Sequence, residues 1–275
     1  MCSKFTNLPP IQKKIDTVQI TKFLSYLFIS SFILVGCSDD DNDSPFDNNP
    51  SQAANRQPLG TSANDLLSDT NFKSLTVEMV AVQGFEPTAT AVNNFRQFLE
   101  NRVFKPDGIT INLRTVSSAN KAPFTTEEIA EIENDTRTLF NAGDDITVYV
   151  YFADGSKEDD TTEQITLGTA YLNTSVVIYE GTLRRLGGSR PGGPSLSDIE
   201  TAALNHEFAH LLGLVNIGTP LQSDHEDPDS NGHCNVPNCL MEAAIEFSSG
   251  IMGMGDSVPE LDDLCIADLQ ANGGR

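Results

Sequence analysis

The sequence predicts an α+β fold in which a twisted mixed β-sheet is backed by helices, and two observations support this prediction. Segments whose apolar residues alternate with a period of two take turns along the chain with segments whose apolar residues recur every three or four positions. The resulting β-α-β-α-β order is typical of a sheet covered by helices. The chain has 275 residues, 39% of them hydrophobic, and is therefore long enough to bury a sizeable core in one domain.

Periodicity defines the first three elements. Leu75, Val77 and Met79 alternate with their neighbours, which predicts a strand. Between positions 88 and 103 the apolar residues fall at steps of three and four, which predicts a helix with one buried face. The period returns to two at positions 109–116, which predicts a second strand.

A capping signal introduces the next helix. Thr125 and Glu128 match a capping box, and apolar residues follow at helical steps as far as Phe140. Residues 146–152, "ITVYVYF", form a continuous run of β-branched and aromatic side chains. Such a run favours a strand that is covered on both faces.

Two further elements complete the predicted domain. The segment "ITLGTAYLNTSVVIY" predicts one or two strands, interrupted at Gly168 and Asn173. After a loop rich in glycine and proline, Ser197 and Glu200 match a second capping box, which predicts another helix. All candidate catalytic residues lie on this helix or beyond it.

The N-terminal 36 residues have the organisation of a cleaved signal peptide. Four lysines precede an apolar run at positions 23–36, and this run is shorter than the ~20 residues of a membrane-spanning helix. It ends in "LVGC", which resembles the lipobox of bacterial lipoproteins. The resemblance implies that Cys37 is acylated and anchors the chain to a membrane. The acidic residues after Cys37 resemble export signals, which implies a location at the outer membrane or on the cell surface of a bacterium.

Composition separates a tether from the domain. Residues 37–70 are rich in Asp, Asn, Ser and Pro and predict an acidic disordered tether, whereas residues 71–275 carry the periodic pattern of a folded domain. The chain has 39 acidic and 17 basic side chains, a formal net charge of -22. A phosphate backbone would be repelled by this charge, so we expect no nucleic-acid partner.

All four histidines of the chain lie between positions 206 and 233. His206 and His210 are four positions apart on the predicted helix, so their imidazoles project from one face and can bind one ion. Glu207 lies between them, where its carboxylate can accept a proton from metal-bound water. This HExxH pattern predicts a Zn²⁺ cofactor.

The residues after the HExxH pattern extend it to "HEFAHLLG". Gly213 can adopt the left-handed conformation that ends a helix and turns the chain back toward a metal. HExxHxxG resembles the metzincin clan of zinc endopeptidases, in which a third zinc-binding histidine follows three residues later. Asn216 occupies that place here, and an amide is a poor zinc ligand.

The segment "HCNVPNCLM" resembles HCx4CxM of the archaemetzincins. This resemblance implies that His233 is the third zinc ligand and that Met241 forms the Met-turn, in a metzincin-like fold with a small C-terminal subdomain. The family has three residues from the glycine to this histidine, whereas Gly213 and His233 are 20 apart, which implies an insertion of 17 residues. Such an insertion adds little closure entropy. His225, inside the insertion, is the alternative third ligand.

The cysteines near the C-terminus leave two interpretations open. Archaemetzincins have a second zinc site formed by four cysteines, whereas this chain offers Cys234, Cys239 and Cys265, with Asp268 as a fourth candidate. Outside the cytoplasm, a disulfide between Cys234 and Cys239 with Cys265 free is the alternative. The pattern "DPDSNG" at 227–232 imitates half of a calcium loop, and an acidic solvated loop is the preferred interpretation.

Together these features predict a zinc-dependent metalloendopeptidase that acts on protein or peptide substrates. The resemblance implies an upper subdomain, residues 71–214, and a lower subdomain, residues 215–275, with substrate pairing along an edge strand near residues 168–173. The alternative is a non-catalytic surface lipoprotein, either a binding module or an inactive peptidase with a structural zinc.

Overall fold

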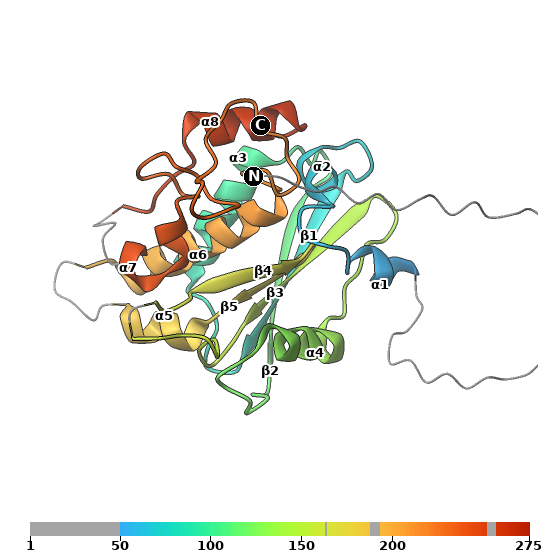
Figure 1. Cartoon of the computed structure of the whole chain (residues 1–275). Coiled ribbons are helices and arrows are strands. Elements are labelled where there is room, and N and C mark those ends of the chain that lie inside the picture. Colours follow the sequence, from blue (N-terminus) through green and yellow to red (C-terminus); the bar gives the residue numbers. More distant parts are fainter. Residues whose placement is uncertain (1–49, 163, 188–192, 252–256) are drawn as a thin grey trace, which may run out of the picture. The chain divides into compact units, whose positions relative to one another are not determined.

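The computed structural model describes residues 50–162, 164–187, 193–251 and 257–275 (Figure 1). The predicted signal peptide and Cys37 lie outside the described residues. Among the residues that are described, no helix has the length and apolar character needed to cross a bilayer. The elements in chain order are α1 Pro50–Ala54, α2 Ala63–Leu67, β1 Ser74–Val82, α3 Ala89–Arg102, β2 Gly108–Val116, α4 Thr126–Thr136, β3 Asp145–Phe152, β4 Gly168–Leu172, β5 Ser175–Ile178, α5 Glu180–Leu186, α6 Leu196–Leu211, the 3-10 helix η1 Ala243–Glu246, α7 Ser248–Ile251 and α8 Asp263–Ala271.

A five-stranded mixed sheet forms the centre of the fold. Its strand order is β2-β1-β3-β5-β4. The β1 strand pairs in parallel with both β2 and β3, β3 pairs in parallel with β5, and β4 runs antiparallel to β5 at the edge of the sheet. The predicted α+β fold with a mixed sheet and backing helices is therefore confirmed.

Helices cover both faces of the sheet. The period-two residues of β1 that begin with Leu75 belong to the core that packs against α3 and α6. Val80 and Val82 of the same strand belong to a second core, on the opposite face, with Ile129 and Ile132 of α4. Figure 1 shows α3 and α6 on one side of the sheet and α4 on the other. The site helix α6 is therefore held between the sheet and the C-terminal segments.

The α4 helix begins as predicted and ends early. Thr125 and Glu128 form a capping box in which each side chain accepts the other residue's backbone N–H. The helix ends at Thr136, so the expected continuation to Phe140 is wrong. The backbone N–H groups of Thr138 and Leu139 instead donate to the buried carboxylate of Glu78. In a continued helix these two N–H groups would have donated to backbone carbonyls, and the buried Glu78 carboxylate accepts them instead.

The start of α6 also differs from the prediction. Ser195 is the N-cap and forms the capping box with Asp198, not Ser197 with Glu200. Glu200 is fully buried and accepts hydrogen bonds from the backbone N–H and the hydroxyl of Thr88, the N-cap residue of α3. Glu200 thus joins the two helices that cover this face of the sheet.

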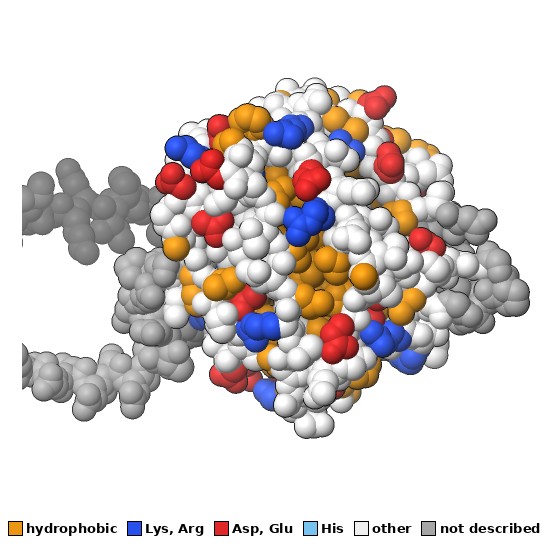
Figure 2. Space-filling model, turned by 180° about the vertical axis from the view of Figure 1, so that it is seen from behind, with side chains coloured by type: hydrophobic (Ala, Val, Ile, Leu, Met, Phe, Trp, Pro, Cys, Tyr) orange, Lys and Arg blue, Asp and Glu red, His pale blue; other side chains and the backbone are white. Residues whose placement is uncertain are grey.

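Residues 50–67 were expected to belong to the disordered tether, and here the structure differs. They form α1 and α2, and Leu66 and Leu67 of α2 are fully buried in the main core. The side-chain amide of Asn55 donates to the backbone carbonyl of Thr147 in β3 at 2.9 Å. The few apolar residues of this polar segment are enough because they join the core that the rest of the domain builds. On the face shown in Figure 2, acidic and basic side chains surround a strip of apolar ones.

A buried pair of carboxyl groups gives the fold a testable pH dependence. Glu180 of α5 and Glu200 of α6 are fully buried, and burial followed by the neighbouring Glu200 raises the pKa of Glu180 to about 9. The protonated form of Glu180 is therefore favoured on folding. The contribution of the protonated Glu180 to the stability of the fold is fully present below the ordinary pKa near 4.5. This contribution is lost as the pH rises toward 9.

Glu180→Gln should therefore stabilise the protein at pH 8 by on the order of 1 kcal/mol, because glutamine imitates the protonated acid and still accepts from Arg184. Thermal unfolding should show a rise of about 2–4 °C at pH 8 and a smaller one at pH 5. Glu131→Gln, at an exposed ion pair with Lys121, is the matched control. An equal shift at both pH values would contradict the assignment.

Candidate metal centre

Two imidazoles of the site come from one face of α6. His206 and His210 are both buried, and their Nε2 atoms lie 3.2 Å apart. Two nitrogens bound to one tetrahedral zinc at about 2.05 Å would be separated by about 3.3 Å. The pair therefore has the spacing that a shared ion requires.

The third imidazole comes from a short hairpin at the end of the insertion. The backbone N–H of Asp227 donates to the carbonyl of His233 at 2.8 Å, and the N–H of Asn235 donates to the carbonyl of His225 at 2.9 Å. Neighbouring side chains in an extended segment point to opposite sides. The ring of His233 accordingly lies 5.3 Å from that of His206 and 5.1 Å from that of His210, measured between centroids.

Outer hydrogen bonds orient two of these rings. The Nδ1 of His206 lies 2.7 Å from the carbonyl oxygen of Leu240, and the Nδ1 of His233 lies 3.1 Å from the hydroxyl of Ser230. Each contact leaves Nε2 directed toward the cluster, the arrangement usual for zinc-binding histidines. The candidate ligand atoms of the three histidines all lie within 4.8 Å of one another.

Burial favours the neutral rings of His206 and His210. Burial, followed by the neighbouring His233, lowers the pKa of His206 to about 4. Burial lowers the pKa of His210 well below its usual range. Neutral imidazoles keep a free lone pair at pH 7, which a metal ligand needs. The Nε2 of His233 makes no other hydrogen bond among the described residues and has only the Glu246 carboxylate nearby, at 3.3 Å, so the donor set fits a zinc ion.

Glu207 lies at the edge strand of the sheet. Its Oε2 accepts the backbone N–H of Ala170 in β4 at 2.8 Å. A Cβ atom at Gly168 would lie only 2.5 Å from Cγ of Glu207, so only glycine allows this close approach. Burial, followed by the nearby Glu246 carboxylate, raises the pKa of Glu207 well above its usual range. These contacts hold one carboxylate oxygen and leave the other for chemistry.

Glu246 is a site residue that the sequence did not reveal. Its Oε2 lies 3.3 Å from Nε2 of His233. The residue closes η1, after the HCx4CxM segment, and no spacing rule marks it. Its carboxylate stands beside the position where the three imidazoles converge.

The structure also places the remaining residues of the predicted motif. Met241 is fully buried, and its carbonyl accepts the N–H of Cys234 at 2.7 Å, which connects the predicted Met-turn to the hairpin. Gly213 has the expected positive φ of 74°. Asn216 is exposed, and its amide donates to Glu226, so it stands outside the cluster.

His225 lies in a second cluster, with cysteines. Its Nδ1 is 3.3 Å from Sγ of Cys234 and 3.9 Å from Sγ of Cys265. The sulfurs of Cys239 and Cys265 are 3.8 Å apart, and all three cysteines are free and buried. A disulfide needs a separation near 2.05 Å, whereas two thiolates on one zinc at about 2.3 Å would be about 3.8 Å apart. The arrangement fits a metal site better than the disulfide between Cys234 and Cys239.

Two aspartates support this second cluster. Asp268 is buried and lies 2.8 Å from Nε2 of His225, so it orients the ring of this histidine from behind. The sequence had offered Asp268 as a fourth ligand with the cysteines, and the structure does not place it among them. Asp262 lies 3.1 Å from Sγ of Cys234, and the candidate ligand atoms of His225, Cys234, Asp262 and Cys265 all lie within 4.8 Å of one another, a group that does not include Cys239. Asp262 also caps α8 through Leu264, and zinc prefers sulfur and nitrogen. We therefore regard Cys239 as the better ligand.

The fold is of the archaemetzincin type. The crystal structure of archaemetzincin from Methanopyrus kandleri matches with a TM-score of 0.50 and 16% sequence identity, over 73% of this chain and 96% of that one. Metalloproteinase-II from Bacteroides fragilis matches with a TM-score of 0.39 and 16% identity, over 82% of this chain and 57% of the other. No protein-family model and no curated protein matches the chain.

Proposed function

We propose that this protein is a zinc-dependent metalloendopeptidase. The observation that carries the proposal is the convergence of three buried imidazoles, His206, His210 and His233, together with the buried carboxylate of Glu207, the residue that follows His206 in α6. This combination provides both a metal site and a base for water, which peptide hydrolysis requires. The likeness in fold agrees with this chemistry and adds nothing about activity.

The residues have separate roles in the proposed reaction. His206, His210 and His233 would hold the zinc, which supplies a Lewis acid and a water of lowered pKa when bound. Glu207 accepts the water proton at Oε1, since Oε2 is held by Ala170. Its raised pKa allows the carboxyl to keep that proton until the leaving amine takes it.

An extended peptide is the substrate that the surroundings favour. The β4 strand is an edge of the sheet and directs the N–H of Ala170 at Glu207. An edge strand offers unpaired backbone groups to an added strand. Pairing of the substrate with residues 168–172 would bring its peptide bond alongside the histidines.

One observation favours the non-catalytic alternative. The carboxylate of Glu246 is 3.3 Å from Nε2 of His233 and can supply a fourth metal ligand. Three histidines and a carboxylate would then form a closed shell, as in structural zinc sites. Under this alternative, the Glu207 side chain has no catalytic role.

The second cluster supports a structural zinc. We propose that Cys234, Cys239, Cys265 and His225 hold it, with Asp268 behind the histidine. Cys234 adjoins His233, so this ion would fix the hairpin that delivers His233 to the first site. Calcium is not favoured, because sulfur and nitrogen atoms suit zinc.

Lipidation at Cys37 and an outer-membrane or cell-surface location remain proposals that rest on the N-terminal sequence. Metabolic labelling with a fatty-acid analogue is expected to mark the wild type and spare Cys37→Ser. Labelling of the variant would contradict the anchor.

Metal content and cleavage of a peptide library test the function. The purified protein should contain two zinc ions per chain and cleave peptides at internal bonds. A chelator should abolish cleavage, and added Zn²⁺ should restore it. Zinc-loaded protein that leaves the whole library intact would overturn the peptidase proposal and favour the closed shell.

A further inference from the structure

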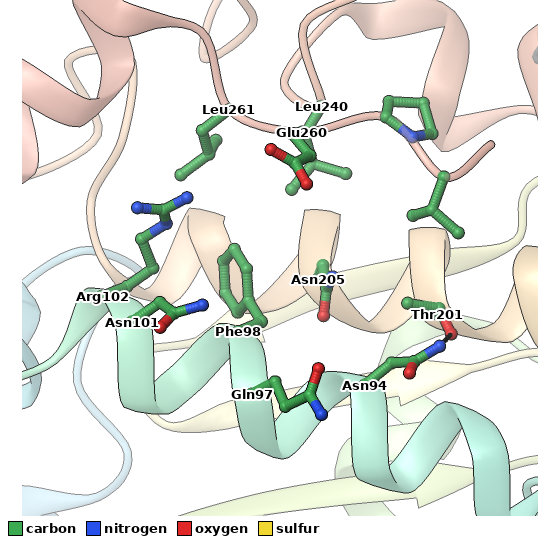
Figure 3. A pocket seen from close by; sticks show the side chains of 12 residues that line it. Asn94, Gln97, Phe98, Asn101, Arg102, Thr201, Asn205, Leu240, Glu260 and Leu261 are labelled. Atoms are coloured by element: carbon green, nitrogen blue, oxygen red, sulfur yellow. Dashed lines mark hydrogen bonds between the residues drawn. The ribbon is translucent and has the colours of Figure 1, made fainter.

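A pocket of about 210 Å³ lies between α3, α6 and residues 258–261 (Figure 3). None of the four histidines lines it. Asn205, which precedes His206 in α6, forms part of its wall, and Leu240, whose carbonyl contacts His206, forms another part. The pocket is therefore built on backbone segments that also carry the candidate metal centre, whereas the candidate zinc-binding side chains do not line it.

The pocket contains buried polar groups that lack partners. Asn205 is 7% exposed, and its Oδ1 accepts no hydrogen bond from any described residue. The Nε of Arg102 is buried and likewise without a partner among the described residues. An unpaired buried polar atom costs about 1–3 kcal/mol, which a ligand can recover by supplying the missing partner.

The pocket also carries two opposite charges that do not pair with each other. Arg102 of α3 and Glu260 of the 258–261 segment have no ion-pair partner among the described residues. Figure 3 shows their charged ends facing the space above α6. Phe98 and Leu240 supply apolar surface between them. The walls thus offer a cation, an anion, an acceptor and an apolar area.

We propose that this pocket binds a free α-amino acid as its zwitterion. The α-carboxylate pairs with Arg102, the ammonium group pairs with Glu260 and Oδ1 of Asn205, and the side chain packs on Phe98. An isolated anion would be repelled by Glu260, and a neutral sugar would leave the charges of Arg102 and Glu260 unpaired. A volume of about 210 Å³ is enough to hold one amino acid. The proposal does not depend on peptidase activity.

Calorimetric titration of the full chain with the twenty L-amino acids tests the site. At least one amino acid with a side chain suited to Phe98 should bind. Its N-acetyl and amide derivatives, which lose one charge each, should bind roughly tenfold to hundredfold more weakly. Arg102→Met, Glu260→Gln and Asn205→Ala should weaken the amino acid to a similar degree.

Glu100→Gln is the matched control, because Glu100 is an exposed acid of α3 that does not line the pocket. It should bind as the wild type does. Circular dichroism shows whether each variant is folded, and Arg102→Met with Glu260→Gln suffices should Asn205→Ala unfold. The proposal is overturned when no amino acid binds, or when binding survives in both charge variants.

Discussion

Replacing Glu207 with glutamine is expected to lower kcat/KM for peptide cleavage by about 10²–10⁴-fold while zinc content stays unchanged. Glutamine has the same shape, and its carbonyl still accepts the N–H of Ala170 at the edge strand. It has no basic oxygen to take the water proton. The three imidazoles do not depend on this carboxylate, so the metal should be retained. Steady-state cleavage and metal analysis of the same sample measure both quantities.

Two further variants make this result decisive. Glu131→Gln alters an exposed carboxylate far from the histidines and should leave kcat/KM unchanged. Glu246→Gln tests the closed shell, since removal of a metal-binding carboxylate would open a position for water. Activity that is absent in the wild type and appears in Glu246→Gln would support the non-catalytic alternative. Full activity in Glu207→Gln would remove Glu207 from the mechanism.

Local patterns predicted the sheet and the site helix because their causes are local. The alternation at Leu75, Val77 and Met79 reflects a strand with one face on the core of α3 and α6. The HExxH spacing places two imidazoles on one helical face in any context. Capping boxes were less specific, since both Ser195 and Ser197 have an acid three residues later. Only the buried contact of Glu200 with Thr88 excludes the second choice.

Long-range contacts were beyond such reasoning. The sequence left His225 and His233 as alternatives because both follow the helix at distances that no local rule fixes. The structure separates them through the hairpin that pairs Glu226 with Cys234. The folding of α2 was missed for the same reason. Its leucines are few, and their burial depends on partners supplied by distant segments.

Substitution of the two histidines should separate the two proposed zinc ions. His233→Ala should lower zinc from two ions to one per chain and abolish cleavage, because only the first site loses a ligand. His225→Ala should also lose one ion, and should destabilise the protein by about 3 kcal/mol, since Oδ2 of the buried Asp268 loses its partner and only Oδ1 keeps one, the backbone N–H of Gln222. Thermal unfolding and metal analysis distinguish the variants.

The identity of the lost ion can be read with cobalt in place of zinc. Thiolate ligands give Co²⁺ a sulfur-to-metal absorption band, and imidazoles do not. His233→Ala should keep this band because Cys234, Cys239 and Cys265 are intact. His225→Ala should weaken or lose it, whereas His225→Cys, which restores a fourth soft ligand, should recover the second ion. If His233→Ala loses cleavage but keeps both ions, the third ligand of the first site must be a residue other than His233. Retention of both ions in His225→Ala would mean that the three cysteines and Asp262 suffice.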